Sequence, residues 1–301
     1  TTLFRSLAEL DHVKVNFKEK VAVDFDGIIE IEEGERVGII GSNGAGKTTL
    51  LKSILGLVPH KGNITLGIPQ EEIAVHMQQN EYIETVPVRI IIEMVMGCRI
   101  KDNPQLENMI DFFEFGDSLK KRWKHLSGGQ KQRLTLILVM CKESPLTMFD
   151  EVTSGLDFET RQRLMAKLVE WYKERNATLL ITSHYYSELD NFATKILYME
   201  KGKVVDYGKK EDLFRKYCGS AVLIFPGSEA GEKIAGEHRR IVAPESQIAL
   251  TCADRNEENE IAGKLIDADI NYRRSNSDIE IMTLNAKAKC REKVARKAQN
   301  E

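Results

Sequence analysis

The stretch Gly41-Ser42-Asn43-Gly44-Ala45-Gly46-Lys47-Thr48 decides the fold of this 301-residue chain. It follows an apolar run at residues 37–40 and opens into Thr49 and an apolar segment at residues 50–55, as a strand-to-helix turn requires. Its glycines let the backbone turn tightly, so that N–H groups point at phosphate oxygens beside the positive end of the next helix. Lys47 adds a positive charge, and the Thr48 hydroxyl is placed to ligate Mg²⁺. The stretch therefore predicts a phosphate-binding loop.

A second informative segment is Leu126-Ser127-Gly128-Gly129-Gln130, which precedes an apolar run at residues 134–138. Read as local structure, it predicts a helix start in which Ser127 caps the helix and Gln130 completes a capping box. A helix start with free N–H groups and a serine hydroxyl can also hold an anion. The segment therefore predicts a second anion site next to a helix cap.

The third segment is the apolar run at residues 146–149, which ends in Asp150 and Glu151. It predicts a buried strand with two carboxylates at its carboxyl end. Carboxylates at that edge of an open α/β sheet face the ligand crevice. These two side chains are therefore candidates for metal binding and for general-base chemistry.

In this order, the three segments resemble those of the ATP-binding-cassette (ABC) ATPases. The resemblance implies that Asp150 holds Mg²⁺ through water and that Glu151 polarises the attacking water. It also implies that the signature segment around Ser127 closes over the γ-phosphate held by a second cassette. The family usually has proline after this glutamate, whereas this chain has Val152. Since residues 153–157 match the family's D-loop, we expect altered loop stiffness and intact chemistry.

Three further positions gain a role from the resemblance. His184, after the apolar run at residues 179–182, matches the switch histidine that contacts the γ-phosphate. Gln78 matches the Q-loop glutamine that senses Mg²⁺ and water, although Gln79 beside it leaves the register open by one residue. Phe17 lies where the family keeps an aromatic residue to stack on adenine, with an ordinary core position as the alternative.

The resemblance assigns these residues to three roles. ATP binding falls to Phe17, Ser42, Asn43, Gly44, Ala45, Gly46, Lys47, Thr48, Thr49, Ser127, Gly128, Gly129 and Gln130. Mg²⁺ binding falls to Thr48, Gln78 and Asp150, and hydrolysis to Glu151, His184 and Gln78.

Composition narrows the class of protein. With 42% hydrophobic and 30% charged residues, the chain predicts a globular protein with room for two domains. Its net charge of −3 gives no electrostatic reason to expect nucleic acid as a partner. The five cysteines are scattered without metal-ligand spacing, which favours a reducing cytoplasm. The amino-terminal segment lacks the pattern of a signal peptide, and the apolar runs are far shorter than the ~18 residues of a membrane helix.

The resemblance implies an α/β fold class: a P-loop NTPase cassette with a RecA-like core, an antiparallel β subdomain and a helical subdomain. A small carboxyl-terminal α+β domain is expected in addition. Residues 7–66 read as short strands around the phosphate loop, and residues 159–175 as an amphipathic helix. Residues 86–122 read as the helical subdomain. Two apolar stripes there are expected in the core, one of Ile90, Ile91, Met94 and Val95 and one of Leu106, Met109, Ile110 and Phe113.

The pattern changes after Gly219, so we expect an ABC ATPase domain at residues 1–219 and an accessory domain at 220–301. Residues 221–225 and 248–252 are predicted strands, and residues 256–268 a helix. A hairpin is expected between residues 270–274 and 279–283, followed by a basic helix at 285–299. That helix is either a solvated face or a contact for a membrane surface or phosphate. In size and element order, this region resembles the accessory domains of drug, antibiotic and peptide exporter ATPases.

The sequence thus predicts the ATP-hydrolysing subunit of an ABC transporter, with an exporter as the main hypothesis. Two cassettes, as homodimer or heterodimer, would enclose two ATP molecules. Separate transmembrane permease subunits would hold the pair on the inner face of the cell membrane. An importer subunit and an Fe–S assembly ATPase remain alternatives. A translation factor would carry two cassettes, and a chromosome-structure protein would need a long coiled coil.

Overall fold

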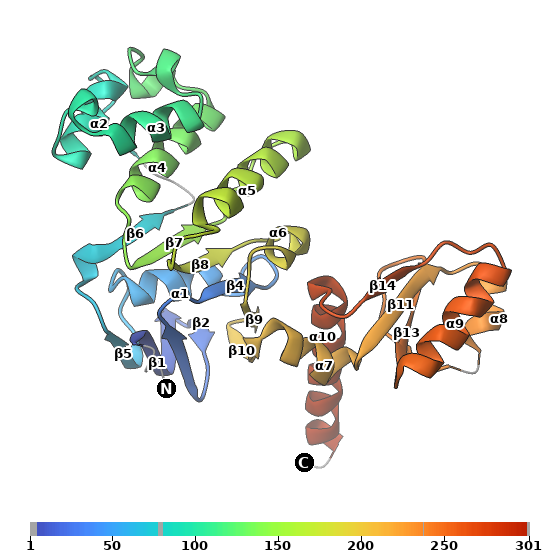
Figure 1. Cartoon of the computed structure of the whole chain (residues 1–301). Coiled ribbons are helices and arrows are strands. Elements are labelled where there is room, and N and C mark those ends of the chain that lie inside the picture. Colours follow the sequence, from blue (N-terminus) through green and yellow to red (C-terminus); the bar gives the residue numbers. More distant parts are fainter. Residues whose placement is uncertain (1–4, 78–80, 237, 300–301) are drawn as a thin grey trace. The chain divides into compact units, whose positions relative to one another are not determined.

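A computed structural model describes residues 5–77, 81–236 and 238–299. These residues form two compact units, which are drawn in one view in Figure 1. The first unit contains the described residues up to Val37 together with Lys47–His184. The second contains Gly38–Gly46 and the described residues from Tyr185 onward. The chain passes between the units inside strand β4 (Arg36–Ile40) and again after Gly46.

The elements follow the order expected of a cassette. Those of the first unit are β1 (Ser6–Phe17), β2 (Lys20–Asp24), β3 (Ile28–Glu32), α1 (Lys47–Ile54), β5 (Lys61–Leu66), β6 (Ile73–His76), α2 (Val88–Met96), α3 (Pro104–Phe112), α4 (Gly128–Cys141), β7 (Leu146–Asp150), α5 (Phe158–Tyr172) and β8 (Thr178–Thr182). Those of the second are α6 (Tyr186–Asp190), β9 (Lys195–Glu200), β10 (Lys203–Lys209), α7 (Lys210–Cys218), β11 (Ala221–Pro226), α8 (Glu229–Ala235), β12 (Arg240–Ile241), β13 (Gln247–Cys252), α9 (Arg255–Asp267), β14 (Arg273–Ser275) and α10 (Ile279–Gln299).

An antiparallel sheet forms one part of the first unit. Its long strand β1 pairs with β2, β3 and β5, so the predicted strands at residues 7–66 are confirmed. Alternate side chains of β1 are buried on each side of His12, Ala8 and Leu10 before it and Val13 and Val15 after it. This alternation is expected of a sheet that covers a core with one face.

Strands β8, β7 and β6 lie side by side in that order and run parallel. All residues of β7 and β8 are buried, as in a parallel strand that is covered on both faces. In the register, Asp150 on β7 lies opposite Thr182 on β8. The carboxyl ends of these strands therefore meet at one edge, where the predicted carboxylates stand.

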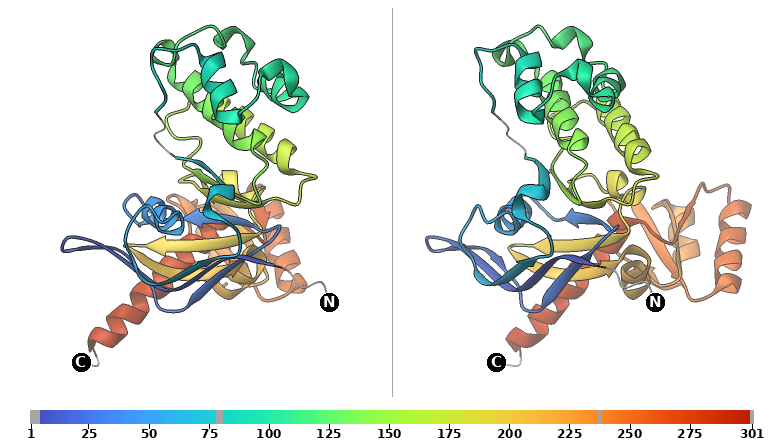
Figure 2. Two further views of the ribbon diagram at one scale, coloured as in Figure 1. Left: turned by 90° about the vertical axis from the view of Figure 1, so that its left-hand side faces the viewer. Right: turned by 60° about the vertical axis from the view of Figure 1, so that its left-hand side comes forward.

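The helical subdomain is present, but one of its two expected core stripes is wrong. In both views of Figure 2, the helices of residues 88–141 gather at the opposite end of the first unit from the blue antiparallel strands. On α3, the stripe of Leu106, Met109, Ile110 and Phe113 is buried as predicted. On α2, Ile91 is buried, whereas Ile90, Met94 and Val95 are 40%, 63% and 56% exposed. Since α2 packs through one side only, the rest of its apolar stripe faces solvent.

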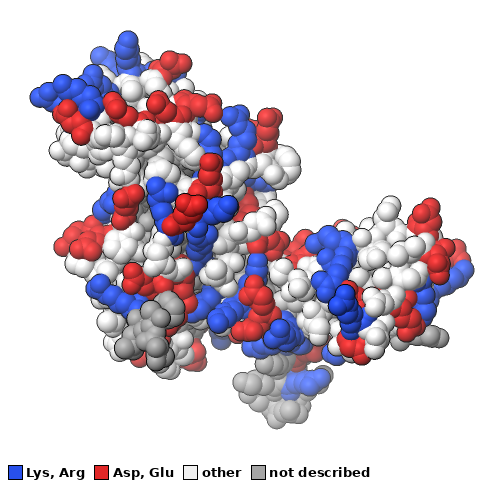
Figure 3. Space-filling model, in the orientation of Figure 1, with Lys and Arg blue, Asp and Glu red and all other residues white. Residues whose placement is uncertain are grey.

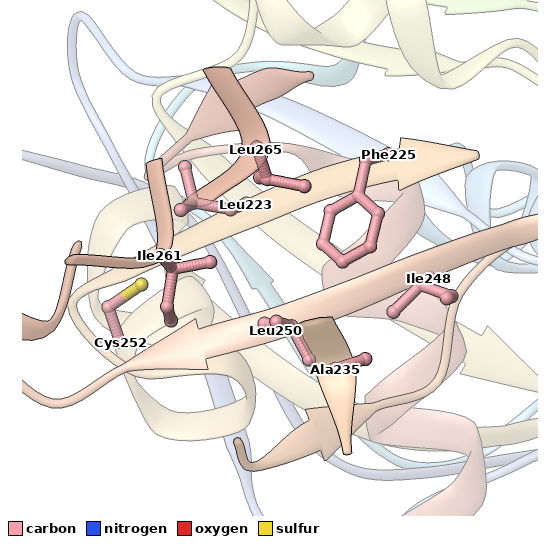
Figure 4. Packing of buried hydrophobic residues seen from close by; sticks show 8 residues of the cluster. All are labelled: Leu223, Phe225, Ala235, Ile248, Leu250, Cys252, Ile261 and Leu265. Atoms are coloured by element: carbon pink, nitrogen blue, oxygen red, sulfur yellow. The ribbon is translucent and has the colours of Figure 1, made fainter. Parts of the chain in front are cut away.

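In the second unit, β11, β12, β13 and β14 form an antiparallel sheet in the order β12-β13-β11-β14. The predicted strands at 221–225 and 248–252 and the helix at 256–268 are confirmed as β11, β13 and α9. Figure 4 shows the core that joins strands and helices. This cluster contains Leu223, Phe225, Ala235, Ile248, Leu250, Cys252, Ile261 and Leu265. The order β-α-β-β-α-β with this pairing is a split βαβ arrangement.

The predicted hairpin at residues 270–283 is wrong in its second arm, because α10 begins at Ile279. The hydroxyl of Ser275 accepts hydrogen bonds from the N–H groups of Ser277 and Asp278. The Asp278 carboxylate then accepts the N–H of Ile281, which starts the helix. The alternation of Ile279, Ile281 and Thr283 resembled a strand, but this side-chain cap favours a helix.

The basic helix predicted at residues 285–299 is confirmed as the later part of α10, which packs on α7, α6 and β10. Part of its basic face has protein partners. Lys287 Nζ lies 3.0 Å from a Glu200 carboxylate oxygen, and Lys289 donates to the Lys216 carbonyl at 2.9 Å. Arg291 stays exposed. Acidic and basic side chains are interleaved over the face in Figure 3, as the small net charge suggests.

Candidate functional site

The phosphate loop connects β4 to α1 with a backbone that requires glycine. Gly41 has φ +157°, and a Cβ there would lie 2.3 Å from the Met199 carbonyl oxygen. Gly44 has φ +76°, in the left-handed region, although a Cβ would meet nothing within 4 Å. Inside the loop, the Ala45 N–H donates to the Ser42 carbonyl at 3.0 Å. Glycine is therefore required at position 41 by close packing and at position 44 by the backbone conformation.

The first turn of α1 carries Lys47 and Thr48 directly after this loop. The Lys47 side chain is buried, and its Nζ lies 3.7 Å from Glu151 Oε1 and 3.4 Å from His184 Nδ1. Burial lowers the pKa of Lys47, while the charges of Glu151 and Asp150 act in the opposite direction. A buried ammonium interacts strongly with an anionic ligand, and the carboxylates beside Lys47 favour its charged form.

Asp150 ends β7 and is fully buried. Its Oδ1 accepts hydrogen bonds from the Thr182 hydroxyl at 2.7 Å and the Thr48 hydroxyl at 3.2 Å. Its Oδ2 is buried and has no hydrogen-bond partner among the described residues. A buried carboxylate oxygen without a partner is costly, which makes it suited to a metal-bound water. Thr48 and Asp150 thus supply the hard oxygen ligands that Mg²⁺ prefers, and the residues fit the ion.

Glu151 follows with a left-handed backbone, φ +49°. Its N–H donates to the Thr182 hydroxyl at 2.9 Å, and its Oε1 lies 2.6 Å from His184 Nε2. Because His184 Nδ1 faces the Lys47 ammonium, Nδ1 accepts and the ring proton lies on Nε2, from which it is donated to Glu151. The structure therefore brings Lys47 and His184, which are far apart in the sequence, next to the consecutive carboxylates Asp150 and Glu151.

The signature segment forms the predicted cap. The Ser127 hydroxyl accepts from the Gln130 N–H at 3.3 Å, and the Gln130 side chain accepts from the Ser127 N–H at 3.1 Å. The capping box is thereby confirmed. Added Cβ atoms at Gly128 and Gly129 would meet nothing within 4 Å, so the first turn of α4 is open.

A cavity of about 940 Å³ lies in front of this turn. Gly128, Gly129 and Glu151 line it, and so does His76 at the end of β6. His76 belongs to none of the sequence motifs. Burial lowers its pKa to about 4, so its ring is neutral near pH 7. A histidine in an otherwise apolar buried strand was the signal that could have marked it.

The remaining predicted site residues have mixed outcomes. Phe17 is 47% exposed at the end of β1, so the alternative of a core position does not hold, while adenine stacking stays a prediction. Thr49 lies in α1, where its carbonyl accepts from the Ser53 hydroxyl. Gln78 lies outside the described residues. Val152, in the place of the family's proline, is buried.

The chain is similar in sequence to a known protein family and to its members. The family model described as ABC transporter matches residues 27–154. The manganese transport system ATP-binding protein MntB of Listeria innocua is 30% identical over 216 residues, which are 66% of this chain and 89% of that protein. This chain belongs to the ABC transporter family, as an ATP-binding cassette. Members of the family are ATPases that bind ATP with Mg²⁺ and pair as two cassettes on separate transmembrane subunits.

Two other comparisons refine this assignment. The methionine import ATP-binding protein MetN of Corynebacterium efficiens is 32% identical over 214 residues, and the cassette spans 59% of that relative's length. Those residues are 65% of this chain. A solved dimeric cassette, MJ0796 with ADP and Pi, shares the fold with a TM-score of 0.60, 21% identity and coverage of 67% of this chain and 98% of that one. The predicted P-loop NTPase fold is confirmed. The exporter hypothesis is not supported, because the relatives above are named for import or for manganese transport.

Proposed function

We propose that this cassette is the ATP-hydrolysing subunit of an ABC importer. One observation supports the ATPase part of this proposal best. Lys47 and His184 both lie next to Glu151, which directly follows the buried carboxylate of Asp150. Similarity to import ATP-binding proteins supports the direction of transport. Because these relatives are named for different cargoes, methionine and manganese among them, the cargo is set by other subunits.

The residues divide the chemistry among them. Lys47 holds the β- and γ-phosphates with its buried ammonium. Thr48 and Asp150 would hold Mg²⁺, which would supply neutralisation of the charge that develops on the phosphate oxygens. Glu151 accepts a hydrogen bond from the attacking water and orients it in line with the leaving group. His184 fixes the Glu151 carboxylate through its Nε2 proton and thereby limits the directions in which the base can point.

The second half of each site comes from another cassette. The hydrogen bonds of Ser127 go to Gln130 and Lys131 within its own helix, while the turn at Gly128 and Gly129 stays open. An anion at that helix start would meet free N–H groups and the positive end of the helix dipole. We therefore propose that Ser127, Gly128 and Gly129 bind the γ-phosphate held by the loop of a partner cassette.

A membrane partner is proposed for the helical subdomain. The described helices include none that is long and apolar enough to cross a membrane. The α2 side chains Ile90, Met94 and Val95 are exposed, although burial of such side chains is favourable. We propose that this face docks on a transmembrane permease subunit and holds the cassette at the cytoplasmic side of the membrane. An accessory domain at residues 220–301 remains part of this proposal.

Transport measured in vesicles tests the direction. The cassette would be reconstituted in vesicles with a permease subunit that copurifies with it, with ATP supplied on the cassette side. An importer accumulates radiolabelled methionine or Mn²⁺ on that side, whereas an exporter depletes it. The matched control is the Glu151→Gln cassette in the same vesicles. A cassette that hydrolyses ATP and binds no permease would contradict the transport role and favour an Fe–S assembly ATPase.

A further inference from the structure

We propose that Thr182 is a positioning residue for ATP hydrolysis, because its one hydroxyl holds both the Asp150 carboxylate and the backbone N–H of Glu151. The inference rests on the proposed ATPase function. Neither the three motifs nor the switch histidine includes this residue. Thr182 ends β8, and the parallel register places it opposite Asp150 on β7.

The contacts of the Thr182 hydroxyl fix its role. A hydroxyl has one proton to donate and lone pairs that accept. Since the backbone N–H of Glu151 can only donate, Thr182 Oγ1 accepts from it at 2.9 Å. The hydroxyl proton is therefore available to Asp150 Oδ1, 2.7 Å away. Thr182 is fully buried, so no solvent water replaces either bond at its surface.

The first consequence concerns Asp150. With Oδ1 held by the hydroxyls of Thr182 and Thr48, the carboxylate plane is fixed and the buried Oδ2 is left for the metal-bound water. Hydrogen bonds to charged groups are among the stronger ones in proteins. Loss of the Thr182 bond would let the carboxylate rotate and would weaken the Mg²⁺ site.

The second consequence concerns Glu151. Its left-handed backbone, φ +49°, is uncommon for a residue with a Cβ and must be supported by its surroundings. The bond from its N–H to Thr182 is such a support. Without it, we expect the Glu151 side chain to leave its position 2.6 Å from His184 more often. One substitution should therefore affect both metal binding and the base.

The strand offers a matched control. Thr178, at the start of β8, is as fully buried as Thr182, and its hydroxyl accepts the Gly34 N–H at 2.9 Å. Thr178→Val removes a buried hydroxyl from the same strand without touching the site. Thr182→Val removes the hydroxyl and preserves the shape of the side chain, while Thr182→Ser keeps the hydroxyl.

Binding is the first measurement. A fluorescent, non-hydrolysable ATP analogue would be titrated into each full-length variant with Mg²⁺ and with EDTA. We expect the affinity gained from Mg²⁺ to fall by roughly 10-fold in Thr182→Val. It should stay within about twofold of wild type in Thr178→Val and Thr182→Ser, since neither loses the bond to Asp150. Thermal unfolding of all variants shows whether they are folded.

Hydrolysis is the second measurement. Thr182→Val should lower kcat by roughly 10- to 100-fold with a smaller change in KM, and Thr182→Ser should restore it. The positioning role is wrong if Thr182→Val keeps both the wild-type kcat and the affinity gained from Mg²⁺. It is also wrong if Thr178→Val lowers these two quantities as much as Thr182→Val does. Neither result would contradict the proposed ATPase function. If wild type shows no Mg²⁺-dependent ATP binding, the proposed function fails first and the inference fails with it.

Discussion

Glu151 accepts a hydrogen bond from His184, with 2.6 Å between Oε1 and Nε2. The same carboxylate oxygen lies 3.7 Å from the Lys47 ammonium. Glu151 directly follows β7, His184 lies two residues after β8, and Lys47 begins α1. Lys47 and His184, which we expect to contact the γ-phosphate, thus also contact Glu151, the expected general base. We therefore expect ATP binding and the orientation of the base to be coupled through Lys47 and His184.

Replacing the base separates binding from chemistry. Glu151→Gln should keep ATP binding and lose ~10²- to 10⁴-fold in turnover, as expected when a general base is removed. Lys47→Ala should instead lose ATP binding, because it removes the buried cation. Equilibrium titration and a phosphate-release assay measure the two effects. Glu159→Gln, at an exposed carboxylate on α5, is the matched control. A Glu151→Gln cassette with half of wild-type turnover would contradict the assignment.

Phe17 tests the base-binding side of the site. If its exposed ring stacks on adenine, Phe17→Ala should weaken ATP binding by about 1–3 kcal/mol, and Phe17→Trp should preserve it. Thermal stability should change little, because Phe17 is 47% exposed. Calorimetric titration of ATP and of inorganic triphosphate checks the effect. Equal losses for both ligands would mean that the ring does not contact the base.

The composite site predicts how mutant cassettes complement one another. Ser127→Arg should block ATP-dependent dimerisation of a pure mutant, because the bulky cation fills the open first turn of α4. In a mixture with Lys47→Ala subunits, both lesions fall in one site of the heterodimer and the other site stays intact. ATPase activity should therefore return in part on mixing. A specific activity independent of protein concentration, from a cassette that stays monomeric with ATP, would rule out the two-chain site.

Asp190 predicts a pH effect on stability in the second unit. Its Oδ1 accepts the Ile279 N–H at 3.2 Å, and burial, with Asp278 nearby, raises its pKa above the ordinary value of 3.8. The folded chain thus binds this proton more tightly than the unfolded chain. The contribution of Asp190 to the free energy of unfolding is therefore present below pH 3.8 and is lost as the pH rises through the folded-state pKa.

Asp190→Asn keeps an acceptor for Ile279 and removes the charge. We compare the free energy of unfolding of this variant with that of wild type. The difference should shift in favour of the variant as the pH rises from values at which Asp190 is protonated to neutrality. Urea unfolding at a series of pH values measures the difference. Asp212→Asn, at an exposed carboxylate on α7, is the matched control. A pH-independent difference between Asp190→Asn and wild type would refute the linkage.

Features formed by neighbouring residues can be predicted from the residue types of this chain alone. The loop at residues 41–48, the Ser127–Gln130 capping box and the carboxylates after β7 each depend on neighbours within a few residues, so their residue types were sufficient. The same locality explains why strands β11 and β13 were predicted correctly.

Tertiary structure decided what depends on distant partners. The pairing of β7 with β8 placed Thr182 opposite Asp150, which no pattern within either strand could show. Likewise, the helical periodicity of α2 predicted Met94 in the core, whereas among the described residues nothing covers that side of the helix. At Ile279, period-two alternation competed with a side-chain cap, and the packing of α10 on α7 favours the helix. Burial and register are non-local because each is a property of two segments at once.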